Sequence, residues 1–206
     1  MGQPAEKLPA FESLEGVGEP AERKPEYESV LRAFEAVPSH QVGEIIGGVL
    51  STMPRPAPRH AKASGGLSVF VGGPFGYHVD GPGGWLILTE PELHLGPDIL
   101  VPDLAGWRLE RMPELPETPY FTVAPDWVCE VLSPLTEALD RIKKRPIYAR
   151  EGVKFAWLVN PLAQTLEVFE LNADGIWMVM GLHQEKELVR ARPFDAVELN
   201  LALLWA

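Results

Sequence analysis

Cysteine, long apolar runs and positive charge are all scarce in this chain of 206 residues. Cys129 is the single cysteine, so no internal disulfide can form, and its apolar neighbours favour a buried, inert thiol. No apolar run approaches the length needed to cross a bilayer, and the N-terminus lacks the pattern of a signal peptide. We therefore expect neither secretion nor membrane insertion, and a cytoplasmic, reducing compartment.

Basic residues are outnumbered, because 18 Lys and Arg stand against 29 Asp and Glu, for a net charge of -11. This balance argues against a broad basic surface and predicts weak nonspecific affinity for nucleic acid, so any contact with DNA must be local. The chain also lacks a Walker loop, Cys and His residues at zinc spacing, and a Gly-x-Ser-x-Gly motif. None of the enzyme classes that depend on these motifs is indicated.

The apolar fraction of 46% is sufficient for the core of one domain. Residues 1–36 are acidic, contain several prolines and have few aliphatic residues, which predicts a partly disordered N-terminal segment. Within it, the apolar spacing over 28–37 predicts a short helix. We expect residues 37–206 to form a single domain.

Helix and strand signals alternate through the rest of the chain, which predicts an α/β fold with strands of mixed direction in the sheet. The expected elements are a strand or hairpin over 41–50, an extended proline-rich connector over 53–60, a helix over 61–71, a glycine-rich loop over 72–84, strands over 85–88, 99–101, 127–132 and 155–159, a helix from about residue 135, and a hairpin formed by 166–171 and 176–180.

One acid lies inside an apolar strand. Glu130 stands in the run 127–132, and an ionised carboxylate in a core strand costs several kcal/mol unless a partner satisfies it. Asp103 follows Pro102, whose missing N–H favours a strand entrance or a bulge next to a cleft. A divalent metal shared by both carboxylates would satisfy them. Two strand acids suit Mg²⁺ or Mn²⁺ and the hydrolysis of phosphodiesters.

The sequence leaves other assignments open for these positions. Asp103 is equally suited to capping a turn. Asp98 follows Pro97 and is a second candidate for the metal ligand, and Glu92 is a further acid in the same region. Only one of the two Pro-Asp pairs needs to supply the ligand.

The helix expected from about residue 135 carries polar side chains at regular spacing. Asp140, Lys144 and Tyr148 are four residues apart, which places them along one stripe of a regular helix. Pro146 makes this arrangement conditional, because an interior proline bends or ends a helix and Tyr148 would then follow a kink.

Residues 134–154 hold six basic residues against three acids, a local net charge of +3. Beside two carboxylates, such a stretch is expected where a phosphate approaches a metal, and a solvated helix face is the alternative. His60 with Arg55 and Arg59 forms a weaker cluster, for which we expect a surface loop rather than a phosphate contact.

Together these residues resemble the Uma-two-type family of restriction endonuclease-like proteins, within the PD-(D/E)XK nuclease superfamily. The resemblance covers about 42–171, roughly two thirds of the chain. Its motifs, in order, are Gly43-Glu44-Ile45-Ile46-Gly47-Gly48, the proline-rich lead to His60, Val101-Pro102-Asp103-Leu104, Glu130-Val131-Leu132-Ser133-Pro134, Asp140 with Lys144 and Tyr148, and Gly152-Val153-Lys154-Phe155-Ala156-Trp157-Leu158-Val159-Asn160-Pro161.

The resemblance implies a restriction-endonuclease-like core, a mixed central sheet flanked by helices, with a C-terminal β-hairpin. It implies Asp103 and Glu130 as metal ligands and Glu44 as a further ligand or general base. Lys144, or its neighbour Lys143, would replace the lysine that the superfamily places two residues after the acid, where this chain has leucine. The last thirty or so residues lie outside the match and are expected to be an accessory segment or an oligomer contact.

The sequence thus predicts a Mg²⁺-dependent (or Mn²⁺-dependent) DNA endonuclease. Asp103 and Glu130 would hold the metal, Lys144 would orient or activate the attacking water, and Glu44 would complete the site. One alternative is a non-catalytic interaction or regulatory protein on the same fold, favoured by the negative charge and the absence of a base-reading element. Another is a hydrolase of small phosphate esters, with the loop 72–84 as a lid.

DNA is the expected partner and no membrane is expected. Trp205 would be costly to expose, so it either returns to the core or contacts a second subunit. Together with the two-fold cleavage geometry common in the superfamily, this favours a homodimer.

Overall fold

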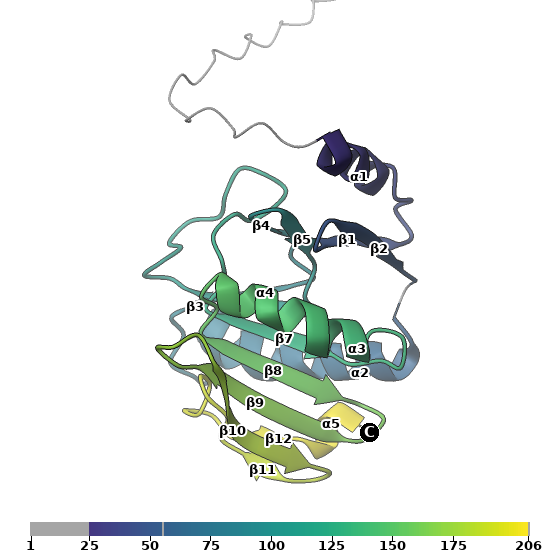
Figure 1. Cartoon of the computed structure of the whole chain (residues 1–206). Helices are drawn as coiled ribbons and strands as arrows, with labels where there is room; N and C mark the ends of the chain where they lie inside the picture. The colour runs from purple at the N-terminus through teal and green to yellow at the C-terminus, as the bar shows by residue number, and fades with distance from the viewer. Residues whose placement is uncertain (1–24, 55, 206) are drawn as a thin grey trace, which may run out of the picture.

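The computed structural model describes residues 25–54 and 56–205. Its centre is a six-stranded sheet in the order β10-β9-β8-β7-β6-β3 (Figure 1). β7 and β8 run parallel, whereas the other neighbours pair antiparallel, so the sheet is mixed. Its strands are β3 (Trp85–Thr89), β6 (Leu104–Arg108), β7 (Trp127–Val131), β8 (Phe155–Asn160), β9 (Thr165–Leu171) and β10 (Trp177–Gln184).

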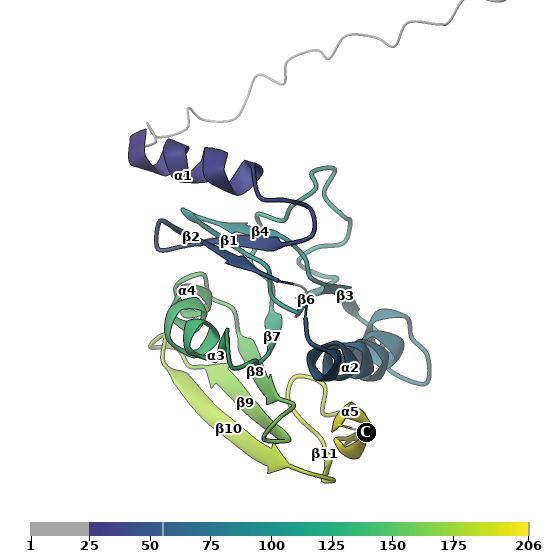
Figure 2. The ribbon, with the colours of Figure 1, turned by 90° about the vertical axis from the view of Figure 1, so that its right-hand side faces the viewer.

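A helical segment connects the two parallel strands, as a parallel pair requires. It consists of α3 (Glu137–Leu139), the π-helix η2 (Asp140–Lys144) and α4 (Arg145–Arg150). Figure 2 shows this segment on one side of the large sheet and α2 (Pro58–Leu67) on the other. The π-helix η1 (Ser68–Gly76) continues α2. The sheet is therefore covered on both faces at its centre, where β7 and β8 are buried, whereas the edge strand β10 is largely exposed.

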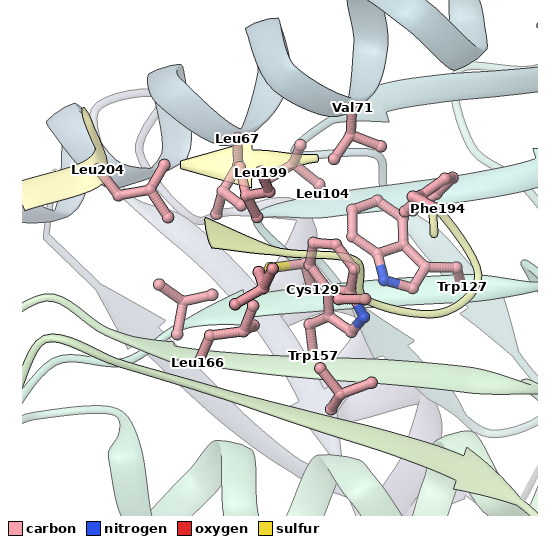
Figure 3. Close-up of a cluster of buried hydrophobic side chains, with 14 of the residues drawn as sticks. Leu67, Val71, Leu104, Trp127, Cys129, Trp157, Leu166, Phe194, Leu199 and Leu204 are labelled. Atoms are coloured by element: carbon pink, nitrogen blue, oxygen red, sulfur yellow. The ribbon is translucent and has the colours of Figure 1, made fainter. Parts of the chain in front are cut away.

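The two faces of the large sheet carry separate apolar cores. Alternate residues of a strand point to opposite faces, so Trp127 and Cys129 pack toward α2, whereas Val128 packs toward α4. The core on the α2 side contains several aromatic side chains and is closed by the C-terminal segment (Figure 3). That segment comprises β11 (Leu188–Val189), β12 (Leu199–Asn200) and α5 (Ala202–Trp205).

A smaller, four-stranded sheet of antiparallel pairs lies beside the large one in the order β2-β1-β5-β4. Figure 2 shows α1 (Pro25–Glu35) lying across its outer side. A Cβ at Gly43 would lie 3.1 Å from Val37 and 3.3 Å from Phe34, so glycine permits this close contact. The strands are β1 (Val42–Ile46), β2 (Val49–Met53), β4 (Leu93–Leu95) and β5 (Asp98–Leu100).

The predicted α/β class with a mixed central sheet is confirmed. The predicted hairpin over 41–50 is β1 and β2, joined at Gly47 and Gly48, whose φ angles of 61° and 79° suit glycine. The predicted C-terminal hairpin is β9 and β10. Its turn is held by the Asn172 side chain, which accepts hydrogen bonds from the N–H groups of Asp174 and Ile176.

Several expectations about local structure were wrong. The extended connector expected over 53–60 stops at residue 57, because α2 begins at Pro58, a residue favoured in the first turn. The stretch 72–84 is not loop throughout, because η1 extends to Gly76 and a π-helix accommodates Pro74. The strand β4 was not predicted, and β6 was indicated only by the strand entrance or bulge expected at Asp103. β6 contains Gly106, and a glycine inside a strand usually weakens it. Here, however, a Cβ on residue 106 would lie 3.2 Å from Trp127 and 3.3 Å from Trp85. Glycine is thus required by packing within the sheet.

The C-terminal segment is part of the core, contrary to the expectation of an accessory region. Phe194, Leu201 and Leu204 are all buried against the large sheet. Trp205 is half-buried at the edge of this core, and its indole N–H donates to the Glu185 carbonyl oxygen at 2.6 Å. Trp205 thus packs against the core, one of the two predicted alternatives, and a contact with a second subunit stays a prediction.

The predicted division into an N-terminal segment (1–36) and a single domain (37–206) stays a prediction. Residues 1–24, where we expect disorder, lie outside the described residues. The helix expected over 28–37 is α1, which begins three residues earlier at Pro25, a residue favoured in the first turn. Within the described residues, no helix is both long enough and apolar enough to span a membrane.

Candidate active site

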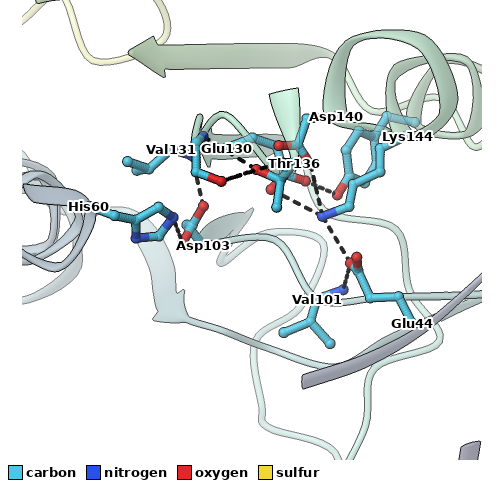
Figure 4. A network of polar contacts seen from close by, with 11 residues as sticks. Glu44, His60, Val101, Asp103, Glu130, Val131, Thr136, Asp140 and Lys144 are labelled. Atoms are coloured by element: carbon cyan, nitrogen blue, oxygen red, sulfur yellow. Dashed lines mark hydrogen bonds and ion pairs between the residues drawn. The ribbon is translucent and has the colours of Figure 1, made fainter. Parts of the chain in front are cut away.

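Strand pairing brings Asp103 next to the strand of Glu130. β6 pairs antiparallel with β7, with Leu104 opposite Cys129, and continuing this register places Asp103, at the entrance of β6, opposite Glu130. The Val131 N–H donates to Asp103 Oδ2 at 2.7 Å (Figure 4). Glu130, which is buried in β7, and Asp103, which precedes β6, therefore lie on the same side of the sheet.

Lys144 is the centre of a buried ion network (Figure 4). Its Nζ lies 2.9 Å from Glu44 Oε1, 3.3 Å from Glu130 Oε2 and 3.2 Å from Asp140 Oδ1. The Lys144 side chain is 2% exposed, so the ammonium depends on these three carboxylates for compensation. The three acids come from β1, β7 and the first residue of η2, so this contact joins both sheets to the connecting helices.

The stripe predicted for Asp140, Lys144 and Tyr148 is present despite Pro146. The π-helix η2 ends at Lys144, and α4 then begins with Pro146 in its first turn, where a missing N–H costs little. The Tyr148 hydroxyl donates to Glu130 Oε1 at 2.5 Å. Both oxygens of Glu130 thus have a donor from this segment.

Glu44 reaches the network from the small sheet. Its Oε1 accepts the Val101 N–H at 2.7 Å in addition to the contact with Lys144. Its second oxygen, Oε2, is buried and has no hydrogen-bond partner among the described residues. An unpaired buried carboxylate oxygen is costly and commonly marks a place where an ion, water or ligand binds.

Carboxyl groups outnumber the single ammonium in this network. Burial raises the pKa of Glu130 well above its ordinary value, and Lys144 only partly opposes this effect. Burial also raises the pKa of Glu44 and of Asp140. For Lys144, burial acts to lower the pKa, yet the surrounding carboxylates raise it well above the ordinary value, so the lysine is charged. One ammonium faces several carboxyl groups, an imbalance that a further cation would relieve.

A cavity of about 70 Å³ opens beside these residues. It has room for about two waters, since one occupies about 30 Å³ in the liquid. Its wall includes Asp103, Glu130, Asp140 and Lys144, together with His60. A small ion and a water would therefore have access to both carboxylates.

His60 belongs to this site, which the sequence did not predict. It lies on α2 rather than on a surface loop, and its Nε2 is 3.1 Å from Asp103 Oδ1, with the His60 side chain 15% exposed. Only the packing of α2 beside β6 and β7 reveals this contact. The neighbouring Arg59 is exposed, and Arg55 lies outside the described residues.

The His60–Asp103 contact predicts a measurable change in titration. Burial acts to lower the pKa of His60, but the hydrogen bond and charge of Asp103 raise it above the ordinary value of 6.5. Asp103→Asn should therefore lower this pKa. Because it is raised in the folded state, its contribution to stability is complete below pH 6.5 and is lost as the pH rises through the folded pKa.

The measurement is an NMR titration of the imidazole signal of His60 in EDTA, in the wild type and in Asp103→Asn. An unchanged His60 titration in Asp103→Asn would contradict the contact.

The alternatives left open by the sequence lie elsewhere. Asp98 is buried, but it accepts the Gly47 N–H at 2.6 Å and pairs with Arg150 at 2.9 Å. Glu92 pairs with His94 at 2.7 Å. Lys143 is exposed and lines a different cavity from the buried Lys144. The cavity beside the network is lined by Asp103 and Lys144, and by neither Asp98 nor Lys143.

Most of the basic stretch 134–154 is neutralised by acids. Arg141 pairs with Glu137 and Glu167, Arg150 with Asp98 and Glu151, and Lys154 with Glu170. The excess of +3 in the sequence is therefore not a free phosphate-binding surface.

A mixed sheet with helices on both faces, and an Asp, a Glu and a Lys gathered at one place, define a restriction-endonuclease-like protein. Residues 31–203 match the model of the Uma2 family, described as "Putative restriction endonuclease", and the chain belongs to this family. The match extends beyond the predicted 42–171 at both ends, so the C-terminal segment is part of the family domain.

Five solved chains resemble the structure. One is described as a putative nuclease belonging to DUF820 from Anabaena variabilis, with a TM-score of 0.68 and 22% sequence identity. The alignment covers 85% of this chain and 97% of that one. At this identity the similarity concerns the fold. No curated protein matches the chain.

Proposed function

We propose that this protein is a Mg²⁺-dependent endonuclease that hydrolyses phosphodiester bonds in DNA. The observation that carries the proposal is the meeting of Asp103 and Glu130 at a small cavity, with the buried Lys144 bound to Glu130. Family membership supports the same conclusion.

The carboxylates suit Mg²⁺ or Mn²⁺. Each carboxylate oxygen of Asp103 and Glu130 accepts one hydrogen bond or ion pair and has a second lone pair. Within the described residues, no cluster of three or more His, Cys, Asp and Glu side chains is arranged for a metal. Mg²⁺ does not need one, since one or two carboxylates with water and substrate phosphates commonly hold it. When bound, it would stabilise charge on the phosphate and make water a stronger nucleophile.

The remaining residues prepare these two ligands. Tyr148 and Lys144 each donate to one oxygen of Glu130 and so fix its orientation. The Val131 N–H fixes Asp103 in the same way. Second contacts of this kind hold metal ligands in place and tune their basicity.

Lys144 would orient the attacking water, and Glu44 would complete the site. Lys144 lines the cavity and would turn one of its three N–H donors from a carboxylate to the attacking water. Glu44 does not line the cavity, and its contact of 2.9 Å with Lys144 would hold the ammonium in place. Charge on the phosphate in the transition state would be stabilised by the same ammonium.

The test is a titration of thermal unfolding with Mg²⁺ and Mn²⁺, followed by cleavage of plasmid and oligonucleotide DNA. At tenfold excess over Kd, a ligand of the folded state stabilises by about 1.4 kcal/mol, and about 2–4 °C in Tm is expected per kcal/mol for a chain of this size. Glu130→Gln and Asp103→Asn should lose this stabilisation, and cleavage should fall on the order of 100-fold or more.

Glu117→Gln is the matched control, because Glu117 is an exposed acid away from the cavity. Equal metal stabilisation in Glu130→Gln and Glu117→Gln would place the metal elsewhere. If the wild type neither gains stability with metal nor cleaves DNA, the non-catalytic alternative replaces the proposal.

The small-ester alternative loses its main support. None of the residues around the cavity comes from 72–84, and η1 packs instead against β3. The segment that we expected to act as a lid therefore does not border the site.

A further inference from the structure

A second cavity, of about 300 Å³, lies at the beginning of α2. This volume is at the lower end of the range for small-molecule sites. Arg59 and Lys62 from α2, Pro161 and Gln164 from the turn after β8, and Trp205 from α5 contribute to its wall.

This cavity is basic in a protein of net charge -11. Two cations and no acid line it. Neither Arg59 nor Lys62 forms an ion pair with any residue in the described part of the chain. They differ in this from Arg141, Arg150 and Lys154 of the basic stretch, whose charges are compensated. Two uncompensated cations at one cavity are suited to an anion such as phosphate.

Trp205 adds an aromatic surface to the same cavity. Its indole N–H donates to the Glu185 carbonyl oxygen at 2.6 Å, which fixes the ring, and the side chain is half-buried. A fixed aromatic ring beside cations is the combination with which proteins bind single-stranded nucleic acid, since bases stack on the ring while phosphates meet the cations.

The cavity and the proposed active site both have residues of α2 in their walls: His60 lines the active-site cavity, and Arg59 and Lys62 line this one. His60, which contacts Asp103, stands between Arg59 and Lys62 in the sequence, within one helical turn of about 5.4 Å. A DNA strand with one phosphate at Asp103 and Glu130 would therefore meet these cations with a neighbouring nucleotide.

We propose that this cavity binds a nucleotide of the substrate strand next to the scissile phosphate, with Arg59 and Lys62 on the phosphate and Trp205 stacked on the base. The inference rests on the proposed function, because it assumes a DNA strand in the active site.

The test measures binding of a fluorescent single-stranded oligonucleotide by anisotropy, in EDTA, over a range of salt concentrations. Arg59→Gln with Lys62→Gln should weaken binding and reduce the slope of log Kd against log salt by about 0.7, because both cations contact the same single-strand phosphate. Trp205→Leu should weaken binding about 5-fold or more with the slope unchanged, because stacking carries no counterion release.

Arg32→Gln with Lys154→Gln is the control, since it changes the net charge equally at exposed positions that line neither cavity. A slope equal to that of this control overturns the inference. The metal titration is independent of it: Mg²⁺ should stabilise the Arg59/Lys62 variant as it stabilises the wild type. If the wild type cleaves DNA and the two double variants bind alike, the inference alone fails. If the wild type neither binds nor cleaves DNA, both fail.

Discussion

Replacing Lys144 by methionine should lower the free energy of unfolding by about 3–5 kcal/mol near pH 8, since breaking a buried ion pair leaves its partner charges uncompensated. Methionine retains most of the length of the lysine side chain, so the loss is mainly one of charge. Glu44, Glu130 and Asp140 would face one another without the ammonium that now lies 2.9–3.3 Å from each of them.

This loss should shrink strongly near pH 5. Burial raises the pKa of Glu44, Glu130 and Asp140 in the folded protein, and removing Lys144 raises them further. The folded state then holds more protons than the unfolded state between the unfolded and the folded pKa values, so stability falls as the pH rises through that range. Protonation at low pH removes the repulsion.

Urea unfolding in EDTA at both pH values measures the effect. Lys143→Met, the neighbouring exposed lysine, should be within about 0.5 kcal/mol of the wild type. Lys144→Arg retains the charge, so its free energy of unfolding should depend on pH in the same way as that of the wild type. An equal loss for Lys144→Met at both pH values would attribute the effect to packing and contradict the network of charges.

The parts of the site that the sequence predicts are those with a local pattern. Glu130 interrupts an apolar strand, and Asp140, Lys144 and Tyr148 recur at four-residue spacing. Both patterns are visible within one element. The sequence left Lys143 and Lys144 as alternatives, and in the structure Lys144 is the one that contacts Glu130.

The parts that escaped prediction depend on contacts between distant elements. His60 reaches Asp103 because α2 packs beside the large sheet, and neither residue shows this in its own neighbourhood. β6 was hidden by Gly106, which is required by two tryptophans from other strands. The net charge of 134–154 was misleading for the same reason, since several acids that neutralise it come from other elements.

The C-terminal segment gives the second large effect that we expect. Phe194 is 3% exposed and contacts four aromatic rings, with centroid distances of 4.7 Å to Phe75, 4.9 Å to Trp85, 4.8 Å to Trp127 and 5.6 Å to Trp157. Phe194→Ala should cost about 3–5 kcal/mol, the usual range for deleting a buried aromatic side chain.

Urea unfolding followed by tryptophan fluorescence measures this loss, since three of the contacted rings are indoles. Phe194→Leu refills much of the space and should cost about 1 kcal/mol. Leu203→Ala, a 47% exposed position of the same segment, should be nearly neutral. Because Trp127 and Trp157 belong to β7 and β8, Phe194 also supports the strands that carry and flank Glu130. A cost for Phe194→Ala no greater than that for Leu203→Ala would return the segment to the accessory role expected from the sequence.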